Sequence, residues 1–313
     1  MNVIILGAGG FIGTNLALSL LKDPSINLTL FDRDVFVMSN KRILENKNVR
    51  FVAGDFNDKT NFKTILEGQD VVYHLISSSV PTTSNQQIPG ELSSNIVVTS
   101  KLLDACVECK ISKVVFISSG GTVYGKNVVC PIKETDSTDP INIYGIQKLT
   151  IEKLLHVYNI MFNLDYRIIR LANPYGPFQR PNGILGAVTT FTYKAITNEE
   201  IVVYGDGSVV RDFIYIDDAI KGILNIANGE SKYKLFNLGS GKGTSLKDLI
   251  EEIQNTLNIQ MNVKYLPSRK VDVPENYLDI SRYEEVYGDL KPEPLSEGIL
   301  KTAQFLKDHY VKM

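Results

Sequence analysis

Short apolar runs alternate with amphipathic segments along the first half of the chain. Six of these runs are rich in Val, Ile and Phe and end in turn residues, which predicts strands at 3–6, 28–31, 49–55, 71–75, 113–119 and 166–172. Apolar positions three and four apart predict helices at 11–22, 59–68, 93–108 and 144–158. This alternation predicts an α/β fold: a Rossmann-like, doubly wound parallel sheet with helices on both faces.

The pattern changes after residue 172. Glycine, proline and other turn signals multiply there, as in NPYGPFQRPNG and YGDGSVVRD. We therefore expect residues 1–172 to form the sheet domain, and residues 173–313 to form a smaller, mixed α/β part that binds substrate. The second part is expected to interleave with the first, with the ligand cleft between them.

Composition narrows the class of protein. Hydrophobic residues make up 43% of the 313 residues and charged residues 22%, as in ordinary globular proteins. The net charge of −2 gives no reason to expect nucleic acid or an anionic membrane as a partner, and no apolar run approaches 18 residues. Three cysteines and no visible signal peptide favour a cytoplasmic, reduced protein.

Metal and redox chemistry have little support in the sequence. Cys106 and Cys109 form a CxxC, but they lie in a helical pattern without a second pair, so we interpret them as helix residues. The three histidines do not cluster with Asp or Glu, and no metal is expected. We expect His74, at the end of a buried strand, to be packed or hydrogen-bonded.

A glycine-rich turn follows the first predicted strand. Gly7, Gly10 and Gly13 form a GxxGxxG that opens the first helix, and Asp32 ends the second strand. Glycines let the backbone approach a pyrophosphate, and the helix N-terminus presents free N–H groups to it. Asp32 can accept both hydroxyls of an adenosine ribose, which favours NAD, whereas Arg33 could hold the 2′-phosphate of NADP.

Other residues at this end of the sheet are candidates for the same cofactor. Phe11 and Ile12 lie in the first turn of the glycine-rich helix. Asp55 and Phe56 follow the third strand, where a carboxylate would reach the adenine. Asp55 has a second interpretation as the N-cap of the next helix.

The stretch SSGGTVYG, residues 118–125, is the next candidate for chemistry. Tyr144 and Lys148 follow it at i and i+4, on one face of a predicted helix. Tyr287 and Lys291 share that spacing, but glycine and prolines deny them a helix. A tyrosine needs about 4 kcal/mol of help to act as a base at pH 7. An ammonium about 6 Å away supplies about 3 kcal/mol at an effective dielectric of 20.

These motifs together resemble an extended short-chain dehydrogenase/reductase. The likeness covers essentially the whole chain, because NPYGP, YGDGSVVRDFIYIDD, FNLGSG and PSRKVDVP also match family signatures. Within that family the chain is similar to NAD-dependent nucleotide-sugar epimerases of the UDP-glucose 4-epimerase type. The resemblance implies tightly bound, recycled NAD, a UDP-sugar substrate, and a homodimer that pairs helices 92–109 and 144–160.

The resemblance also implies roles for single residues. Tyr144 would be the acid/base, Lys148 would lower its pKa and hold the nicotinamide ribose, and Thr122 would bind the sugar hydroxyl. The family's usual serine, two residues before Thr122, is Gly120 here. Ser118 or Ser119 could reach in instead.

The UDP-sugar residues are implied in the same way. Asn173, Arg211 and Arg269 would hold the diphosphate, and Asp272 the uridine ribose. Asn276 would lie beside the 2-substituent of the sugar and leave room for a 2-acetamido group. Shifting the alignment by one residue would put Tyr277 there.

The function expected is therefore a 4-epimerase of a UDP-hexose, acting through a transient 4-keto sugar. Residues 118–125 lack the carboxylate that sugar dehydratases and decarboxylases of similar fold carry before VYG. The alternatives are a sugar-nucleotide oxidoreductase or dehydratase with net cofactor turnover, and a non-catalytic NAD-sensing regulator.

Overall fold

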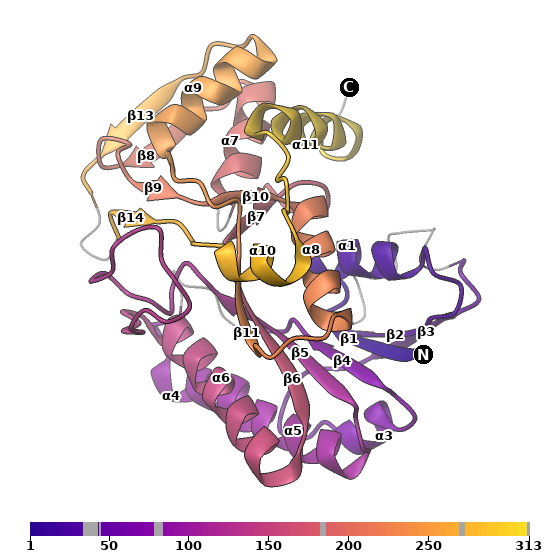
Figure 1. Cartoon of the computed structure of the whole chain (residues 1–313). Coiled ribbons are helices and arrows are strands. Elements are labelled where there is room, and N and C mark those ends of the chain that lie inside the picture. Colours follow the sequence, from indigo (N-terminus) through magenta and orange to yellow (C-terminus); the bar gives the residue numbers. More distant parts are fainter. Residues whose placement is uncertain (34–42, 44, 78–83, 182–185, 269–272, 312–313) are drawn as a thin grey trace. The chain divides into compact units, whose positions relative to one another are not determined.

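The structure is a computed structural model that describes all residues except 34–42, 44, 78–83, 182–185, 269–272 and 312–313 (Figure 1). The chain forms two compact units. Unit 1 comprises residues 1–123, 140–169 and 230–235, and unit 2 comprises residues 124–139, 170–229 and 236–313. The chain therefore passes between the units several times.

A seven-stranded sheet is the framework of unit 1. Its strand order is β11-β6-β5-β4-β1-β2-β3, and β6 and β11 begin in unit 1 and end in unit 2. The strands are β1 Asn2–Leu6, β2 Asn27–Asp32, β3 Val49–Ala53, β4 Val71–His74, β5 Lys113–Ser119, β6 Asp165–Leu171 and β11 Leu235–Leu238. The pairs from β3 through β1 to β5 are parallel, and the strand order reverses at β1. This confirms the predicted doubly wound α/β sheet.

Helices cover the sheet of unit 1 on both faces. The glycine-rich turn leads into α1, Phe11–Leu20, which packs on β1. Figure 1 shows α3, α5 and α6 on the other face. These helices and the elements preceding α5 are α3 Phe62–Leu66, α4 Ile88–Leu92, the π-helical turn η2 Ser93–Val97, α5 Val98–Glu108 and α6 Ile143–Phe162.

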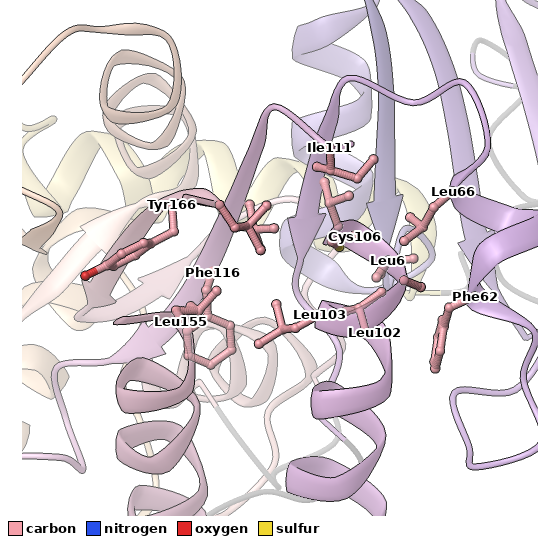
Figure 2. Packing of buried hydrophobic residues seen from close by; sticks show 14 of the residues in the cluster. Leu6, Phe62, Leu66, Leu102, Leu103, Cys106, Ile111, Phe116, Leu155 and Tyr166 are labelled. Carbon is pink, nitrogen blue, oxygen red and sulfur yellow. The ribbon is translucent and has the colours of Figure 1, made fainter. Parts of the chain in front are cut away.

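The apolar core of unit 1 lies between this second helical layer and the sheet (Figure 2). Leu102 and Leu103 of α5 are fully buried beside Phe116 of β5 and Leu155 of α6. Cys106 belongs to the same cluster, and its burial raises the pKa of its thiol. The prediction that Cys106 packs as an ordinary helix residue is confirmed.

Three local predictions differ from the structure. The helix expected at 93–108 begins with the π turn η2, in which the Asn95 side chain donates to the Glu91 carbonyl oxygen. The helix expected at 59–68 shortens to α3 and takes Asn61 as its N-cap. The alternative interpretation of Asp55 as that cap is therefore wrong. Strand β11 was not expected in the sheet.

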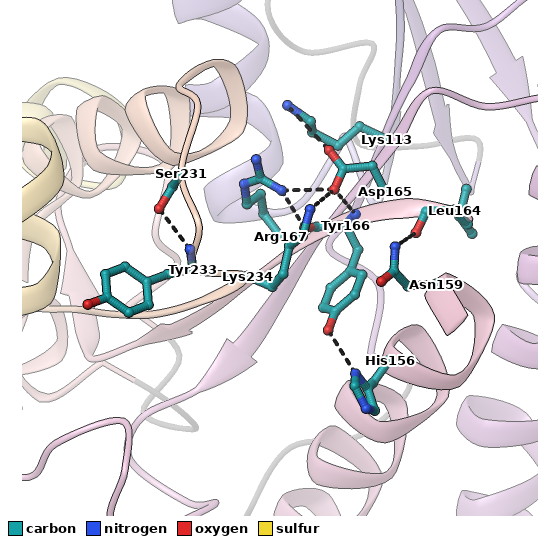
Figure 3. Close-up of polar contacts among 10 residues, drawn as sticks. All are labelled: Lys113, His156, Asn159, Leu164, Asp165, Tyr166, Arg167, Ser231, Tyr233 and Lys234. Carbon is teal, nitrogen blue, oxygen red and sulfur yellow. Dashed lines mark hydrogen bonds and ion pairs between the residues drawn. The ribbon is translucent and has the colours of Figure 1, made fainter. Parts of the chain in front are cut away.

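An ion cluster joins the amino ends of β5 and β6 (Figure 3). The carboxylate of Asp165 accepts a hydrogen bond from Arg167 at 2.9 Å, forms an ion pair with Lys113, and contacts Lys234. Partial burial works to raise the pKa of Asp165, but the Lys234 hydrogen bond and the charge of Arg167 hold it below its ordinary value. The cluster stabilises the end of the sheet opposite the glycine-rich turn.

Unit 2 combines short strand pairs with a helical layer. Its strands are β7 Asn173–Tyr175, β8 Ile201–Tyr204, β9 Val210–Arg211, β10 Phe213–Tyr215, β12 Thr244–Ser245, β13 Val263–Leu266 and β14 Glu275–Asn276. Its helices are α7 Ala187–Thr197, α8 Ile216–Asn228, α9 Leu246–Leu257, α10 Ser281–Tyr287 and α11 Leu295–His309. Helices α7, α9 and α11 pack against one another.

Two further expectations can be checked here. Helix α10 ends at Tyr287, and Lys291 has a φ of 50°, so this pair does not share a helical face, as predicted. In the described ranges, no helix combines the length and apolar character needed to cross a bilayer.

Candidate active site

The glycine-rich turn connects β1 to α1 and leaves the helix N-terminus open. Gly7 has a φ of 91°, which favours glycine, and the N–H of Gly7 donates to the Phe31 carbonyl oxygen at 2.9 Å. A Cβ on Gly13 would lie 2.2 Å from the Gly7 carbonyl oxygen. Gly10 is the N-cap of α1 and provides no capping side chain. The turn thus forms a cradle that requires glycine at positions 7 and 13, and it ends at N–H groups suited to phosphate.

Asp32 lies against this cradle. One carboxylate oxygen of Asp32 accepts the Gly9 N–H at 2.8 Å, and the other accepts the Arg33 N–H at 2.7 Å. The structure therefore brings Gly7, Gly13 and Asp32 together at the carboxyl ends of β1 and β2, where open parallel sheets bind ligands. These residues fit a dinucleotide.

Asp55 and Phe56 follow β3. Asp55 is exposed, and its carbonyl oxygen accepts a hydrogen bond from the Thr60 hydroxyl at 2.5 Å. The Phe56 ring points into the core, with centroids 5.3 Å from both Phe62 and His74. A contact from Phe56 to a cofactor would therefore use its backbone rather than its ring.

Helix α6 begins directly beside the 118–125 loop. The Asn142 side chain caps the helix by accepting the Gly145 N–H at 2.8 Å. A Cβ on Gly145 would lie 2.7 Å from the Thr122 carbonyl oxygen. The glycine therefore lets the first helical turn, which carries Tyr144, contact the backbone of Thr122.

The Thr122 hydroxyl is a candidate ligand contact. Its Oγ1 atom is buried, and no hydrogen-bond partner for it occurs among the described residues. A buried hydroxyl without a partner costs about 1–3 kcal/mol, so a ligand that pairs with it would gain from doing so. Thr122 thus remains a predicted substrate contact.

Lys148 lies one turn after Tyr144 and is 4% exposed. Its ammonium donates to the Ile117 carbonyl oxygen at 2.9 Å and lies 5.5 Å from the centroid of the Tyr144 ring. Burial lowers the pKa of Lys148 to about 8, and the carboxylate of Glu152 works against this shift. Burial also raises the pKa of Tyr144 to about 12.

The two serines of the loop have different roles in the structure. The Ser118 hydroxyl donates to Glu152 at 2.5 Å, so it is engaged away from the candidate site, whereas Ser119 uses its carbonyl oxygen to accept the N–H groups of Thr122 and Val123. A contact from the Ser119 hydroxyl to the substrate stays a prediction. Glu152 was missed in the sequence analysis. Its position four residues after Lys148 was an available signal, because such residues are neighbours on a helix.

His74 is buried at the end of β4. One ring nitrogen lies 3.1 Å from the Thr99 hydroxyl, and the ring packs between Phe56 and Phe116. Burial lowers the pKa of His74 to about 3, and the nearby Lys148 charge adds to the shift. The imidazole is therefore neutral, and the prediction that it is packed and hydrogen-bonded is confirmed.

The predicted substrate residues of unit 2 cluster around β9. Arg211 and Asn276 are direct partners in the parallel pair of β9 and β14. The Arg211 guanidinium donates to the carbonyl oxygens of Val210 and Val273 at 2.7 and 2.8 Å. The N–H and the side-chain amide of Asn173 both donate to the Asp212 carbonyl oxygen, one residue after Arg211.

The remaining predicted substrate residues are less well defined. Arg269 and Asp272 lie outside the described residues. Asn276 is buried, and the ring of Tyr277 lies against Gly243. The structure thus brings Asn173, Arg211 and Asn276 together within unit 2.

Comparison with known proteins gives the class. A family model described as the NAD dependent epimerase/dehydratase family matches residues 3–239. A UDP-glucose 4-epimerase of Mycolicibacterium smegmatis is 31% identical, with 98% of this chain and 99% of the relative covered.

Two solved structures are similar over nearly their full length. A UDP-N-acetylglucosamine 4-epimerase of Methanobrevibacter ruminantium, in complex with UDP-N-acetylmuramic acid, has a TM-score of 0.90 and 31% identity, with 98% of each chain covered. A UDP-glucuronic acid 4-epimerase of Bacillus cereus, in complex with UDP-glucuronic acid and NAD, has a TM-score of 0.88 and 28% identity, with 99% and 100% covered.

The chain therefore belongs to the NAD-dependent epimerase/dehydratase family. Its relatives in sequence and structure are UDP-sugar 4-epimerases, which are isomerases. The resemblance inferred from the motifs is thereby confirmed.

Proposed function

We propose that the chain is an NAD-dependent 4-epimerase that interconverts UDP-glucose and UDP-galactose, with the corresponding N-acetylated pair as the second candidate substrate. The contact between the Tyr144 turn of α6 and Thr122 carries the proposal, together with the ammonium of Lys148 beside the Tyr144 ring. The glycine cradle and Asp32 would hold the cofactor.

In this proposal the chain manages one proton at the C4 oxygen of the sugar. Tyr144 takes that proton as the 4-keto sugar forms and returns it after the sugar has rotated. Thr122 donates or accepts a hydrogen bond at the same oxygen and fixes its position. NAD, when bound, would accept the C4 hydrogen with its two electrons as a hydride and would return that hydride to C4, so the reaction would have no net redox change.

The electrostatics indicate that Tyr144 can act as a base only when oxidised NAD is bound. Lowering a tyrosine pKa from 12 to 7 requires about 7 kcal/mol, at 1.36 kcal/mol per pKa unit. One ammonium about 6 Å away supplies about 3 kcal/mol at an effective dielectric of 20. Lys148 alone therefore leaves Tyr144 protonated. The positive charge of oxidised nicotinamide would supply the remaining stabilisation of the deprotonated tyrosine.

The sequence of the loop argues for epimerisation over dehydration. Residues 118–125 contain no Asp or Glu that could move a proton at C5 or C6 of the sugar. The relatives named above are described as epimerases of UDP-glucose, UDP-N-acetylglucosamine and UDP-glucuronic acid, so they do not identify which UDP-sugar is the substrate of this chain.

The first test uses purified protein with no added cofactor. It is incubated separately with UDP-glucose and UDP-N-acetylglucosamine, and the configuration at C4 is followed by proton NMR. We expect the galacto product in at least the UDP-glucose tube and none with Tyr144→Phe. Accumulation of NADH in proportion to product would instead identify a net oxidoreductase. No change in either tube, even with NAD supplied, would refute the proposal.

The choice between sugars is tested at Asn276. Asn276 is 2% exposed and pairs with Arg211, so we propose that it lies beside the 2-substituent of the sugar. Asn276→Tyr should lower turnover of the N-acetyl substrate by about tenfold or more while UDP-glucose turnover is largely kept. An equal loss on both substrates would refute this placement.

We also propose that the protein is a homodimer. Helix α6 keeps apolar side chains exposed at Ile160 and Met161, with exposed fractions of 69% and 65%, and Val97 of η2 is 47% exposed. Such side chains would be covered if α6 paired with its copy. Light scattering after size exclusion should give twice the chain mass of 34.9 kDa, and a single-chain mass would refute the dimer.

A further inference from the structure

A buried carboxylate lies behind the tyrosine–lysine pair. Glu152 is 4% exposed, which makes it one of the few buried acidic side chains that the structure describes, with Asp212 and the side chain of Glu134 in unit 2. A buried carboxylate is costly unless it is hydrogen-bonded and lies near a positive charge. The energetic cost of burying Glu152 must therefore be compensated by its neighbours.

The end of strand β5 binds both Lys148 and Glu152. The Ile117 carbonyl oxygen accepts the Lys148 ammonium at 2.9 Å, and the hydroxyl of the next residue, Ser118, donates to Glu152 at 2.5 Å. Lys148 and Glu152 are four residues apart on α6, so their side chains leave the helix on neighbouring turns of one face. One strand end thus fixes the lysine and the carboxylate together.

The surroundings of Lys148 contain little other charge. Toward β4 it faces His74, which is neutral, and toward β5 its ammonium lies 4.8 Å from the centroid of the Phe116 ring. On its own helix it faces the Tyr144 ring at 5.5 Å. Burial disfavours the ammonium, and Glu152 is the group that works against this.

Other titratable groups also pack along α6, and one of them, Tyr166 of β6, faces Glu152 itself. From α4, Glu91 accepts a hydrogen bond from Gln147. From α5, Asp104 accepts one from Tyr158.

We propose that Glu152, oriented by Ser118, is a positioning residue that keeps Lys148 protonated at the pH where the enzyme works. This rests on the proposed function, in which the charge of Lys148 acts on Tyr144. Glu152 touches neither substrate nor cofactor in this scheme. It acts through Lys148, and its removal shifts the pH range of activity rather than abolishing the chemistry.

The first experiment measures Lys148 directly and needs no substrate. Protein labelled with ¹³C at lysine Cε is titrated by NMR, and the Lys148 signal is identified by its absence in Lys148→Met. In Glu152→Gln the amide oxygen can still accept the Ser118 hydrogen bond, but the charge is gone. We expect the titration midpoint of Lys148 to fall by about one pH unit.

A matched control removes a charge elsewhere in unit 1. Glu108→Gln takes away one exposed carboxylate, whose partner is Lys63, and should leave the Lys148 midpoint unchanged. If Glu152→Gln moves the midpoint no more than Glu108→Gln does, the proposal is wrong. This result would be readable even if the protein turned over neither UDP-sugar.

The second experiment follows activity against pH. Because Lys148 loses its proton at lower pH in Glu152→Gln, the alkaline limb of kcat should move to lower pH by the same amount. Glu152→Asp keeps the charge and should restore much of the profile. An equal loss of kcat at every pH, with the alkaline limb unmoved, would mean that Glu152 only packs and would overturn the proposal.

A milder variant guards against misfolding. Ser118→Ala keeps the carboxylate but removes the hydroxyl that orients it, so Glu152 is held less firmly beside Lys148 and opposes the effect of burial less. We expect the Lys148 midpoint to fall by about half a pH unit. If Glu152→Gln fails to fold, an unchanged midpoint in Ser118→Ala overturns the proposal.

Discussion

Replacing Gly145 with alanine tests whether the start of α6 positions Tyr144. In an ordinary helix this change stabilises a protein by about 1 kcal/mol. Here the added Cβ would lie 2.7 Å from the Thr122 carbonyl oxygen and 2.8 Å from the Pro140 Cβ. Carbon atoms rest at about 3.5–4.0 Å, so relief requires a displacement of about 0.7 Å.

That displacement determines the expected size of the effect. Overpacking of this kind costs about 1–3 kcal/mol, which exceeds the helical gain and leaves the variant less stable by about 1 kcal/mol. A catalytic group misplaced by about 1 Å can cost about 100-fold in rate, so we expect kcat for UDP-glucose to fall by about tenfold or more. The KM should change less, because the predicted UDP contacts of unit 2 are untouched.

Gly90 of α4 provides the matched control. It also lies in a helix, but among the described residues no atom beyond its chain neighbours and the backbone of its own helix lies within 4 Å of the position its Cβ would take. Gly90→Ala should therefore stabilise the protein and leave kcat unchanged. Thermal unfolding and initial rates of epimerisation measure both variants. If Gly145→Ala behaves like Gly90→Ala, the contact with Thr122 does not position Tyr144, and the reasoning is wrong.

Two further changes test other parts of unit 1. Asp165→Asn removes the negative charge that holds Lys113, Arg167 and Lys234, and should lower the free energy of unfolding by about 2 kcal/mol at pH 7. Because the folded pKa of Asp165 is depressed, its contribution is present above about pH 4, the unfolded pKa, and is lost as pH falls through the folded pKa. Urea unfolding at several pH values measures this, and a difference from wild type that does not shrink in acid would contradict it. Asp32→Asn keeps an acceptor for the Gly9 N–H but loses the charge that would bind the ribose, so NAD affinity should fall by about 10- to 100-fold. NAD retained through purification, read from the nucleotide released on denaturation, should drop accordingly, and full retention would exclude Asp32 as a ribose ligand.

Short-range sequence patterns predicted the site residues that lie close to one another in the chain. Gly7, Gly10 and Gly13 stand next to one strand and one helix, and Tyr144 and Lys148 share one helix face, so spacing alone predicts their placement. Strand β11 is different, because it joins the sheet beside β6 through a pairing between segments far apart in the chain. No short-range pattern reports such a pairing.

The direction in which a side chain points was also not predictable from the sequence. Phe56 stands at the carboxyl end of a strand, as a cofactor contact would, but its ring packs on Phe62 and His74. Glu152 looked ordinary in sequence, because a charged helix position is usually solvated, and Ser118 was considered as a substrate contact rather than as a partner of Glu152. Only the packing of α6 on β5 makes them a buried pair.

The late arrival of β11 bears on how the chain is synthesised. Strand β6 is complete at residue 171, but the strand that covers its outer edge ends at residue 238. At about 5–20 residues per second, the ribosome needs about 3–13 s to make the intervening 67 residues. During that interval β6 presents an unpaired edge to other nascent chains. A fragment truncated after residue 172 would keep that edge permanently, so we expect it to aggregate more than the full chain does.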